Sequence, residues 1–152
     1  MRVLGVQCTT KHAFLTVVEE GSVIPAGPQR LAAAQSMDED HALWGTLATF
    51  GEALDEVKPD RIALLLPGTG ENSKGPHSAW APRIELETLL RMAAAQRDLP
   101  VSRLARATVL ARLGLPRKGK FEELVKPVSQ PVGDYWAAGR LLAAAAAIAE
   151  AN

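Results

Sequence analysis

The sequence predicts an α/β fold in which one mixed sheet has helices on both faces. Residues 1–27 contain short apolar and β-branched runs separated by glycine and polar residues, the pattern of strands joined by tight turns. Strand–helix units follow, and such units connect parallel strands by crossovers. The chain has 152 residues, which is enough for a buried core, so we predict a single domain over residues 1–152 with five strands.

An antiparallel meander is expected at the N-terminus. Its apolar runs start at Val3, Ala13 and Val23. The first run is apolar on both faces, so we place that strand in the centre of the sheet. Residues 25–35, which contain proline, glycine and alanine, are predicted to connect the meander to the first helix.

Residues 36–57 are predicted to form an amphipathic helix. Ser36 and Glu39 have the S-x-x-E spacing of a capping box, and apolar residues then recur at helical spacing. The helix is expected to end at Lys58, because Pro59 disfavours helical backbone in the residue before it.

Strands and helices alternate in the second half of the chain. The apolar run over residues 61–66 is typical of a strand buried on both faces. Pro82 suits the first turn of a helix that we place over residues 82–96, and a fifth strand follows over residues 101–105. The remaining helices are predicted over residues 108–113, 121–125 and 135–151, the last with Asp134 as its N-cap.

Composition and charge exclude several classes of protein. Hydrophobic residues make up 47% and charged residues 22%, which argues against a disordered chain. A single cysteine excludes an internal disulfide and a cysteine-based zinc site, and it suits a reducing cytoplasm, where we expect the protein to be located. The start lacks the apolar region of a signal peptide, and the longest apolar run, residues 141–149, is too short to cross a bilayer. We therefore expect no membrane partner.

Four local motifs occur in a characteristic order. They are Leu4-Gly5-Val6-Gln7, Ala63-Leu64-Leu65-Leu66, Asp98-Leu99-Pro100-Val101 and Asp134-Tyr135-Trp136-Ala137-Ala138, with a glycine- and lysine-containing loop over residues 114–120 before the last. Over nearly the whole chain, this order and spacing resemble the RNase H-like superfamily, and most closely its RuvC-type Holliday-junction resolvases. The resemblance implies that fold, a branched nucleic-acid ligand and a homodimer, for which Trp80 or Trp136 would be candidate contacts.

The matched positions lack most of the acids that the resemblance implies. Such resolvases hydrolyse phosphodiesters with two divalent cations held by several carboxylates, which are the hard oxygen ligands that Mg²⁺ prefers. Here the positions hold Gln7, Leu65, Asp134 and Ala137. One carboxylate cannot hold two dications, and Asp134 is better explained as a helix cap. The sequence therefore predicts a vestigial site with no metal and no cofactor.

Two other candidate sites are weaker. Cys8 and His12 are close enough in sequence for a thiolate–imidazole pair, but a buried, apolar cysteine at a strand end is the commoner arrangement. The segment from Gly68 to Gly75 contains glycine, serine and lysine without the register of a phosphate-binding loop. The three histidines are far apart in the sequence and show no metal-ligand spacing.

One segment has an excess of positive charge. The formal net charge of the chain is zero, yet residues 101–126 hold seven basic and two acidic residues. A basic patch beside a cleft would suit phosphate contacts, whereas a solvated charged face is the alternative explanation. The candidate phosphate-binding residues are Arg103, Arg106, Arg112, Arg117, Lys118 and Lys120.

The sequence leaves two hypotheses for function. The first is a non-catalytic domain that binds nucleic acid weakly, binds a protein partner or has a structural role, and it is the one we favour. The second is a metal-dependent endonuclease of the resolvase type, with Mg²⁺ held by relocated carboxylates such as Glu71, Asp134 and Glu19 or Glu20. The two differ in whether three carboxylates converge near Gln7.

Overall fold

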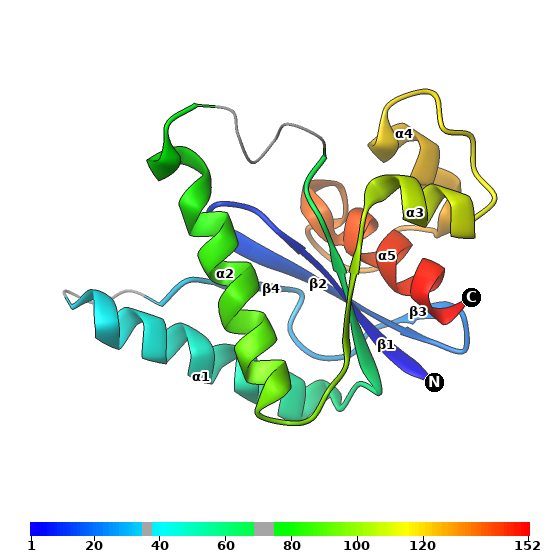
Figure 1. Cartoon of the computed structure of the whole chain (residues 1–152). Helices are drawn as coiled ribbons and strands as arrows, with labels where there is room; N and C mark the ends of the chain where they lie inside the picture. Colours follow the sequence, from blue (N-terminus) through cyan, green and yellow to red (C-terminus); the bar gives the residue numbers. More distant parts are fainter. Residues whose placement is uncertain (35–37, 69–74) are drawn as a thin grey trace.

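A mixed sheet forms the centre of the molecule. The structure is a computed structural model that describes residues 1–34, 38–68 and 75–152. The strand order is β3–β2–β1–β5–β6, with β4 paired to β2 beside β3 (Figure 1). The strands are β1 (Arg2–Cys8), β2 (His12–Glu19), β3 (Ser22–Ile24), β4 (Arg30–Ala32), β5 (Arg61–Leu65) and β6 (Val101–Leu104). The predicted mixed sheet is confirmed, with β1 between the antiparallel β2 and the parallel β5.

The short strand β4 lies in a segment that the sequence predicted as a connection. Strand β2 is eight residues long, and β3 pairs only with its second half, from Val17 to Glu19. The first half would otherwise expose unpaired backbone groups along the sheet edge. Strand β4 pairs with that half, from His12 to Phe14, and the prediction of a simple connection was wrong there.

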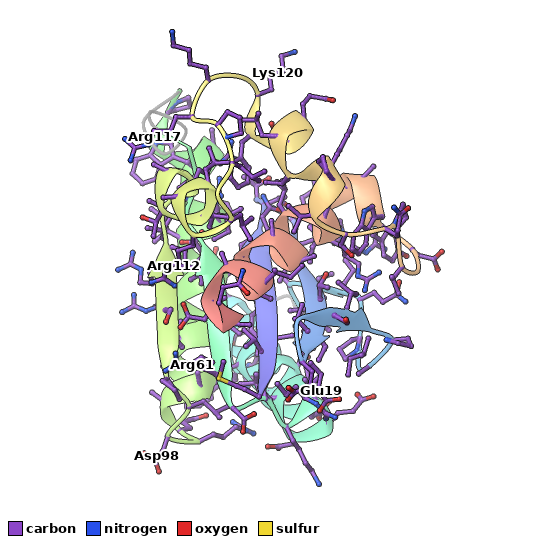
Figure 2. All side chains as sticks on the ribbon, turned by 90° about the vertical axis from the view of Figure 1, so that its right-hand side faces the viewer. Glu19, Arg61, Asp98, Arg112, Arg117 and Lys120 are labelled. Atoms are coloured by element: carbon purple, nitrogen blue, oxygen red, sulfur yellow. The ribbon has the colours of Figure 1, made fainter. Side chains whose placement is uncertain are left out.

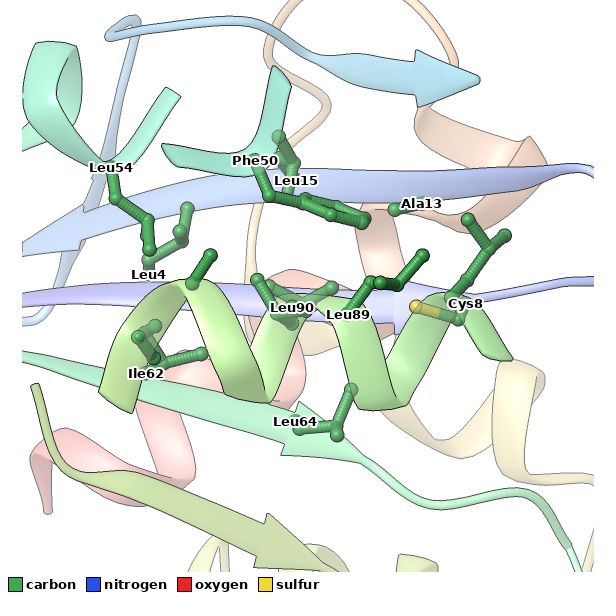
Figure 3. Close-up of a cluster of buried hydrophobic side chains, with 14 of the residues drawn as sticks. Leu4, Cys8, Ala13, Leu15, Phe50, Leu54, Ile62, Leu64, Leu89 and Leu90 are labelled. Atoms are coloured by element: carbon green, nitrogen blue, oxygen red, sulfur yellow. The ribbon is translucent and has the colours of Figure 1, made fainter. Parts of the chain in front are cut away.

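Helices cover both faces of the sheet. Helices α1 (Glu39–Val57) and α2 (His77–Ala95) pack on one face, over side chains such as Leu4, Leu15 and Ile62 (Figure 3). The other face is covered by α3 (Arg106–Arg112), α4 (Phe121–Val125) and α5 (Leu141–Ala151). Along β1 the buried side chains alternate between the two cores, which explains why this strand is apolar throughout.

The two long helices start at different residues from those predicted. Helix α1 begins at Glu39, and the side chain of Asp38 accepts a hydrogen bond from the Asp40 N–H as its N-cap. The predicted cap, Ser36, lies outside the described residues. Helix α2 begins at His77, so Pro82 is inside the helix rather than in its first turn. A proline at this position removes one backbone hydrogen bond, and packing of the helix on the sheet tolerates that loss.

The last helix differs most from its prediction. Tyr135 has a left-handed backbone with a φ of 58°, so the helix cannot continue from Asp134, which makes no side-chain cap. A five-residue turn, η3 (Trp136–Arg140), comes next and is kinked at Gly139, whose backbone is not helical, so α5 begins only at Leu141. Within the described residues, no helix combines the length and apolar character needed to span a membrane.

Candidate functional site

Five residues lie in one lateral row near the carboxyl ends of the parallel strands. The strand pairings join Leu104 of β6 to Leu65, Leu65 to Gln7, Gln7 to Phe14, and Phe14 to Arg30 of β4. Side chains paired laterally point to the same face of a sheet, which here is the face under α5. We call these five residues the lateral row. It changes from aliphatic at β6 to polar, aromatic and cationic at β4.

Gln7 and Leu65 are neighbours in the middle of the lateral row. Leu65 is fully buried, as the sequence predicted, in the core formed by α3, α4 and α5. Gln7 is only 7% exposed, and its side-chain oxygen Oε1 has no hydrogen-bond partner among the described residues. A Cβ atom placed on Gly139 would lie 2.8 Å from that oxygen, so the backbone of η3 covers the glutamine closely.

Asp134 and Ala137 do not join the lateral row. Both are exposed, and Asp134 uses its backbone rather than its carboxylate in its hydrogen bonds. Its N–H donates to Oε1 of Gln29 at 2.8 Å. The residue of η3 that approaches Gln7 is Gly139, which has no side chain to offer as a ligand.

Arg140 holds the loop before α5 against the sheet. Its buried guanidinium donates hydrogen bonds to the backbone oxygens of Leu15, Val132 and Asp134. The Leu15 oxygen lies on the edge of β2 between the parts paired with β3 and β4, so the arginine satisfies an acceptor that the sheet leaves free. Burial lowers the pKa of Arg140, and the charge of Asp134 opposes that shift.

An aromatic and cationic cluster extends the lateral row toward β4. The guanidinium carbon of Arg30 lies 4.2 Å from the ring centroid of Tyr135. The Phe14 ring lies 6.4 Å from the Tyr135 ring and 5.9 Å from the His12 ring, tilted in both cases. The sequence did not predict this cluster, because strand β4 was not recognised and only its register brings Arg30 to Phe14.

The basic residues of the C-terminal half are not one patch. Arg106 forms an ion pair with Glu122 at 3.5 Å, and Arg112 forms one with the buried Glu150 at 2.7 Å. Glu150 also pairs with Arg61 at 2.8 Å, so this carboxylate is shared between two arginines. The structure records no ion pair within the described residues for the remaining four, which are all exposed: Arg103, Arg117, Lys118 and Lys120.

The uncompensated loop cations lie at the same end of the sheet as the lateral row. In Figure 2, Arg117 and Lys120 lie beyond the carboxyl end of β1, whereas Arg61 and Glu19 lie at its amino end. Glu19 pairs with Arg2, and Glu20 binds the N-terminal amine. The suggestion that Glu19 or Glu20 replaces a missing acid near Gln7 was therefore wrong. Glu71 lies outside the described residues.

Cys8 and His12 do not form a catalytic pair. Cys8 belongs to the core under α1 and α2, while His12 lies next to Phe14 and faces the other side of the sheet. Burial raises the pKa of the Cys8 thiol to about 12, which removes the thiolate at neutral pH. Among the side chains that the structure describes, no three histidine, cysteine, aspartate or glutamate residues converge as metal ligands.

Comparisons with known proteins assign the fold. No family model and no curated protein matches the chain. The solved structure of Thermus thermophilus RuvC matches with a TM-score of 0.72 and 17% identity over 99% of this chain and 93% of that one. The structure of T. thermophilus RuvC in complex with a Holliday junction substrate gives the same TM-score at 16% identity, over 99% and 92% of the two chains. The yeast mitochondrial Holliday junction resolvase Ydc2 matches with a TM-score of 0.56 and 12% identity, over 98% of this chain and 80% of its own.

Proposed function

We propose that this chain, which has the RuvC-like RNase H-like fold, binds nucleic acid across the carboxyl end of its sheet without hydrolysing it through a two-metal site. The supporting observation is the lateral pairing of Gln7 with Leu65. The family resemblance implies carboxylates at these two positions. A neutral amide and a buried leucine stand there instead.

The chemistry of these residues favours binding over hydrolysis. A two-metal site clamps the attacking and leaving oxygens with dications held by several anionic ligands. Gln7 would supply one neutral oxygen, and Leu65 and Gly139 would supply none. Asp134 is the acid nearest to Gly139 in the sequence, and this residue is exposed to solvent. These residues do not fit a pair of Mg²⁺ ions.

The cations of residues 117–120 supply the expected phosphate contacts. Arg117, Lys118 and Lys120 are exposed on a loop at the carboxyl end of the sheet (Figure 2). Each phosphate that a cation neutralises releases condensed counterions, so binding by such a loop is independent of sequence and sensitive to salt. The T. thermophilus RuvC neighbour was solved with a Holliday junction substrate, which makes branched DNA the first ligand to test.

The test is fluorescence anisotropy with a four-way junction, a duplex and a single strand, each titrated at several salt concentrations. We expect weak binding at low salt, with log–log slopes of about −0.9 per phosphate contact on duplex and about −0.7 on single strands. The triple variant Arg117→Glu, Lys118→Glu, Lys120→Glu should lose binding to all three ligands. Its melting midpoint should stay near that of the wild type, because the three side chains are exposed.

A matched control separates local contacts from overall charge. The double variant Lys118→Glu, Lys120→Glu is compared with Lys58→Glu, Arg91→Glu, which changes the net charge by the same amount. Lys58 ends α1 and Arg91 lies on α2, both exposed and away from the loop. Equal loss of binding in both doubles, or no binding of the wild type at low salt, would overturn the proposal. A protein-binding role would then be the remaining candidate, and Trp44, which is 68% exposed on α1, would be the side chain to test first.

A further inference from the structure

We propose that Arg30 and Tyr135 form a platform on which an unpaired nucleobase stacks. The ligand of the carboxyl end is then a nucleic acid with accessible bases, such as a single strand or an opened branch point, rather than an intact duplex. This inference rests on the proposed function, because it assigns the ligand class of the same site. It concerns the flank of the lateral row opposite the loop of residues 117–120.

The platform is supported by the sheet on one side and is open to solvent. The Arg30 guanidinium lies over the Tyr135 ring at 4.2 Å from its centroid. Tyr135 is 41% exposed, whereas Phe14, which contacts it from the sheet, is only 5% exposed. Aromatic rings and arginine planes are the surfaces on which proteins stack unpaired bases.

The backbone holds Tyr135 in an unfavourable conformation. Its φ of 58° lies in the left-handed region, which residues other than glycine, asparagine and aspartate rarely occupy. The hydrogen bond from the Asp134 N–H to Gln29, and those from Arg140 to the Val132 and Asp134 oxygens, fix the loop in this state. Strained residues that the surrounding structure enforces are found preferentially at functional sites.

The charges around the platform suit a phosphate next to the stacked base. Lys11, in the turn between β1 and β2, is exposed, as is Arg30. Both charges act on His12, whose pKa is lowered by partial burial first and then by Arg30 and Lys11. Asp134 is the exposed carboxylate beside Tyr135 and is the charge that opposes a phosphate there. Lys11 and Arg30 are therefore the cations that a phosphate beside the stacked base would meet.

A duplex cannot use such a platform without losing its own stacking. Its bases are already stacked and paired, so exposing one requires unpairing, while a single strand offers its faces freely. The platform should therefore discriminate between the two forms. The loop of residues 117–120, which contacts phosphates, should not.

The experiment uses the full chain and an oligonucleotide with 2-aminopurine, either single-stranded or paired with its complement. We expect the fluorescence of the single strand to be quenched on binding, as the base stacks on the platform. Tyr135→Ala should weaken single-strand binding roughly five- to a hundredfold, the range for losing one stacked base, and change duplex binding less than about twofold. Tyr135→Phe keeps an aromatic ring, so its single-strand affinity and its quenching should match those of the wild type.

Additional variants keep the result interpretable. Tyr135→Gly removes the ring and suits the left-handed backbone, so it tests stacking in a chain that folds without strain. Arg30→Lys retains the charge but loses the planar group, and it should weaken single-strand binding more than duplex binding. If Tyr135→Gly leaves single-strand affinity and quenching unchanged while the triple variant of the loop loses binding, the platform is wrong and the proposed function stands. If the wild type binds no nucleic acid at low salt, both are wrong.

Discussion

Leu65 lies between Gln7 and Leu104 in the lateral row and is fully buried. A carboxyl group at this position would enter an apolar core without a partner. We expect Leu65→Glu to lower the free energy of unfolding by about 3 kcal/mol or more, and not to restore nuclease activity. Thermal unfolding followed by circular dichroism measures the loss.

The pH dependence of the stability of Leu65→Glu shows whether burial of the new carboxyl group causes the loss. Burial should raise the pKa of the introduced carboxyl above its value in the unfolded chain, so the folded state keeps a proton that the unfolded state releases. The deficit relative to wild type should then grow as pH rises from about 4 to 7. Leu66→Glu, at a half-buried position one residue further along, is the control and should cost less. An unchanged melting midpoint for Leu65→Glu would show that Leu65 does not occupy the strand position assigned to it.

At the scale of elements, the contact between α5 and β1 depends on small side chains. A Cβ atom on Gly5 would lie 1.9 Å from the backbone oxygen of Ala143 and 3.0 Å from the Cβ atom of Ala147. The first neighbour is backbone and cannot rotate away. The helix therefore rests directly on the central strand, which explains why most of its buried residues are alanines.

Gly5→Ala should force α5 away from the sheet. Overpacking of this kind costs about 1–3 kcal/mol, and we expect the upper end because the clash involves backbone. Chemical denaturation of the variant and the wild type measures this difference in the free energy of unfolding. Gly45→Ala on α1 is the control, since the nearest atom to its new Cβ is another Cβ at 3.0 Å and alanine favours the helix. Equal stability of both variants would mean that α5 packs less closely than described.

At the scale of the whole molecule, the acids considered as relocated metal ligands lie at the opposite end of the sheet from the exposed loop cations. Glu19, Glu20 and Asp60 are at the amino end, where Arg2 and the N-terminal amine contact them. The loop cations are at the carboxyl end (Figure 2). The described residues thus place positive charge, rather than a carboxylate cluster, beside the lateral row.

This distribution predicts that the protein does not cleave nucleic acid with divalent cations. Incubation of labelled junction, single-strand and RNA–DNA hybrid substrates with Mg²⁺ or Mn²⁺ should yield no specific products on a denaturing gel. The matched controls are the same reactions in EDTA and with an Asp134→Ala variant. Specific cleavage that disappears in both controls would show that the endonuclease hypothesis is correct.

The sequence alone predicted most of the elements. Apolar periodicity located α1, and a continuous apolar run located β5. The uninterrupted apolar character of β1 placed it in the centre of the sheet. These features are local, because burial on one or two faces imposes a pattern on consecutive residues. The proximity of Gln7 and Leu65 could also be inferred from the sequence, because both lie near the ends of neighbouring parallel strands.

The tertiary structure alone decided what surrounds these two residues. Strand β4 forms because half of β2 would otherwise lack backbone partners, and its register then brings Arg30 to Phe14 and Tyr135. The left-handed Tyr135 and the turn η3 depend on Arg140, which satisfies backbone oxygens from two distant segments. Neither effect leaves a periodic pattern in the sequence, because a backbone acceptor can be satisfied by any donor that the fold brings within reach. The central strands were therefore predictable from their own residues, and the cationic flank was not.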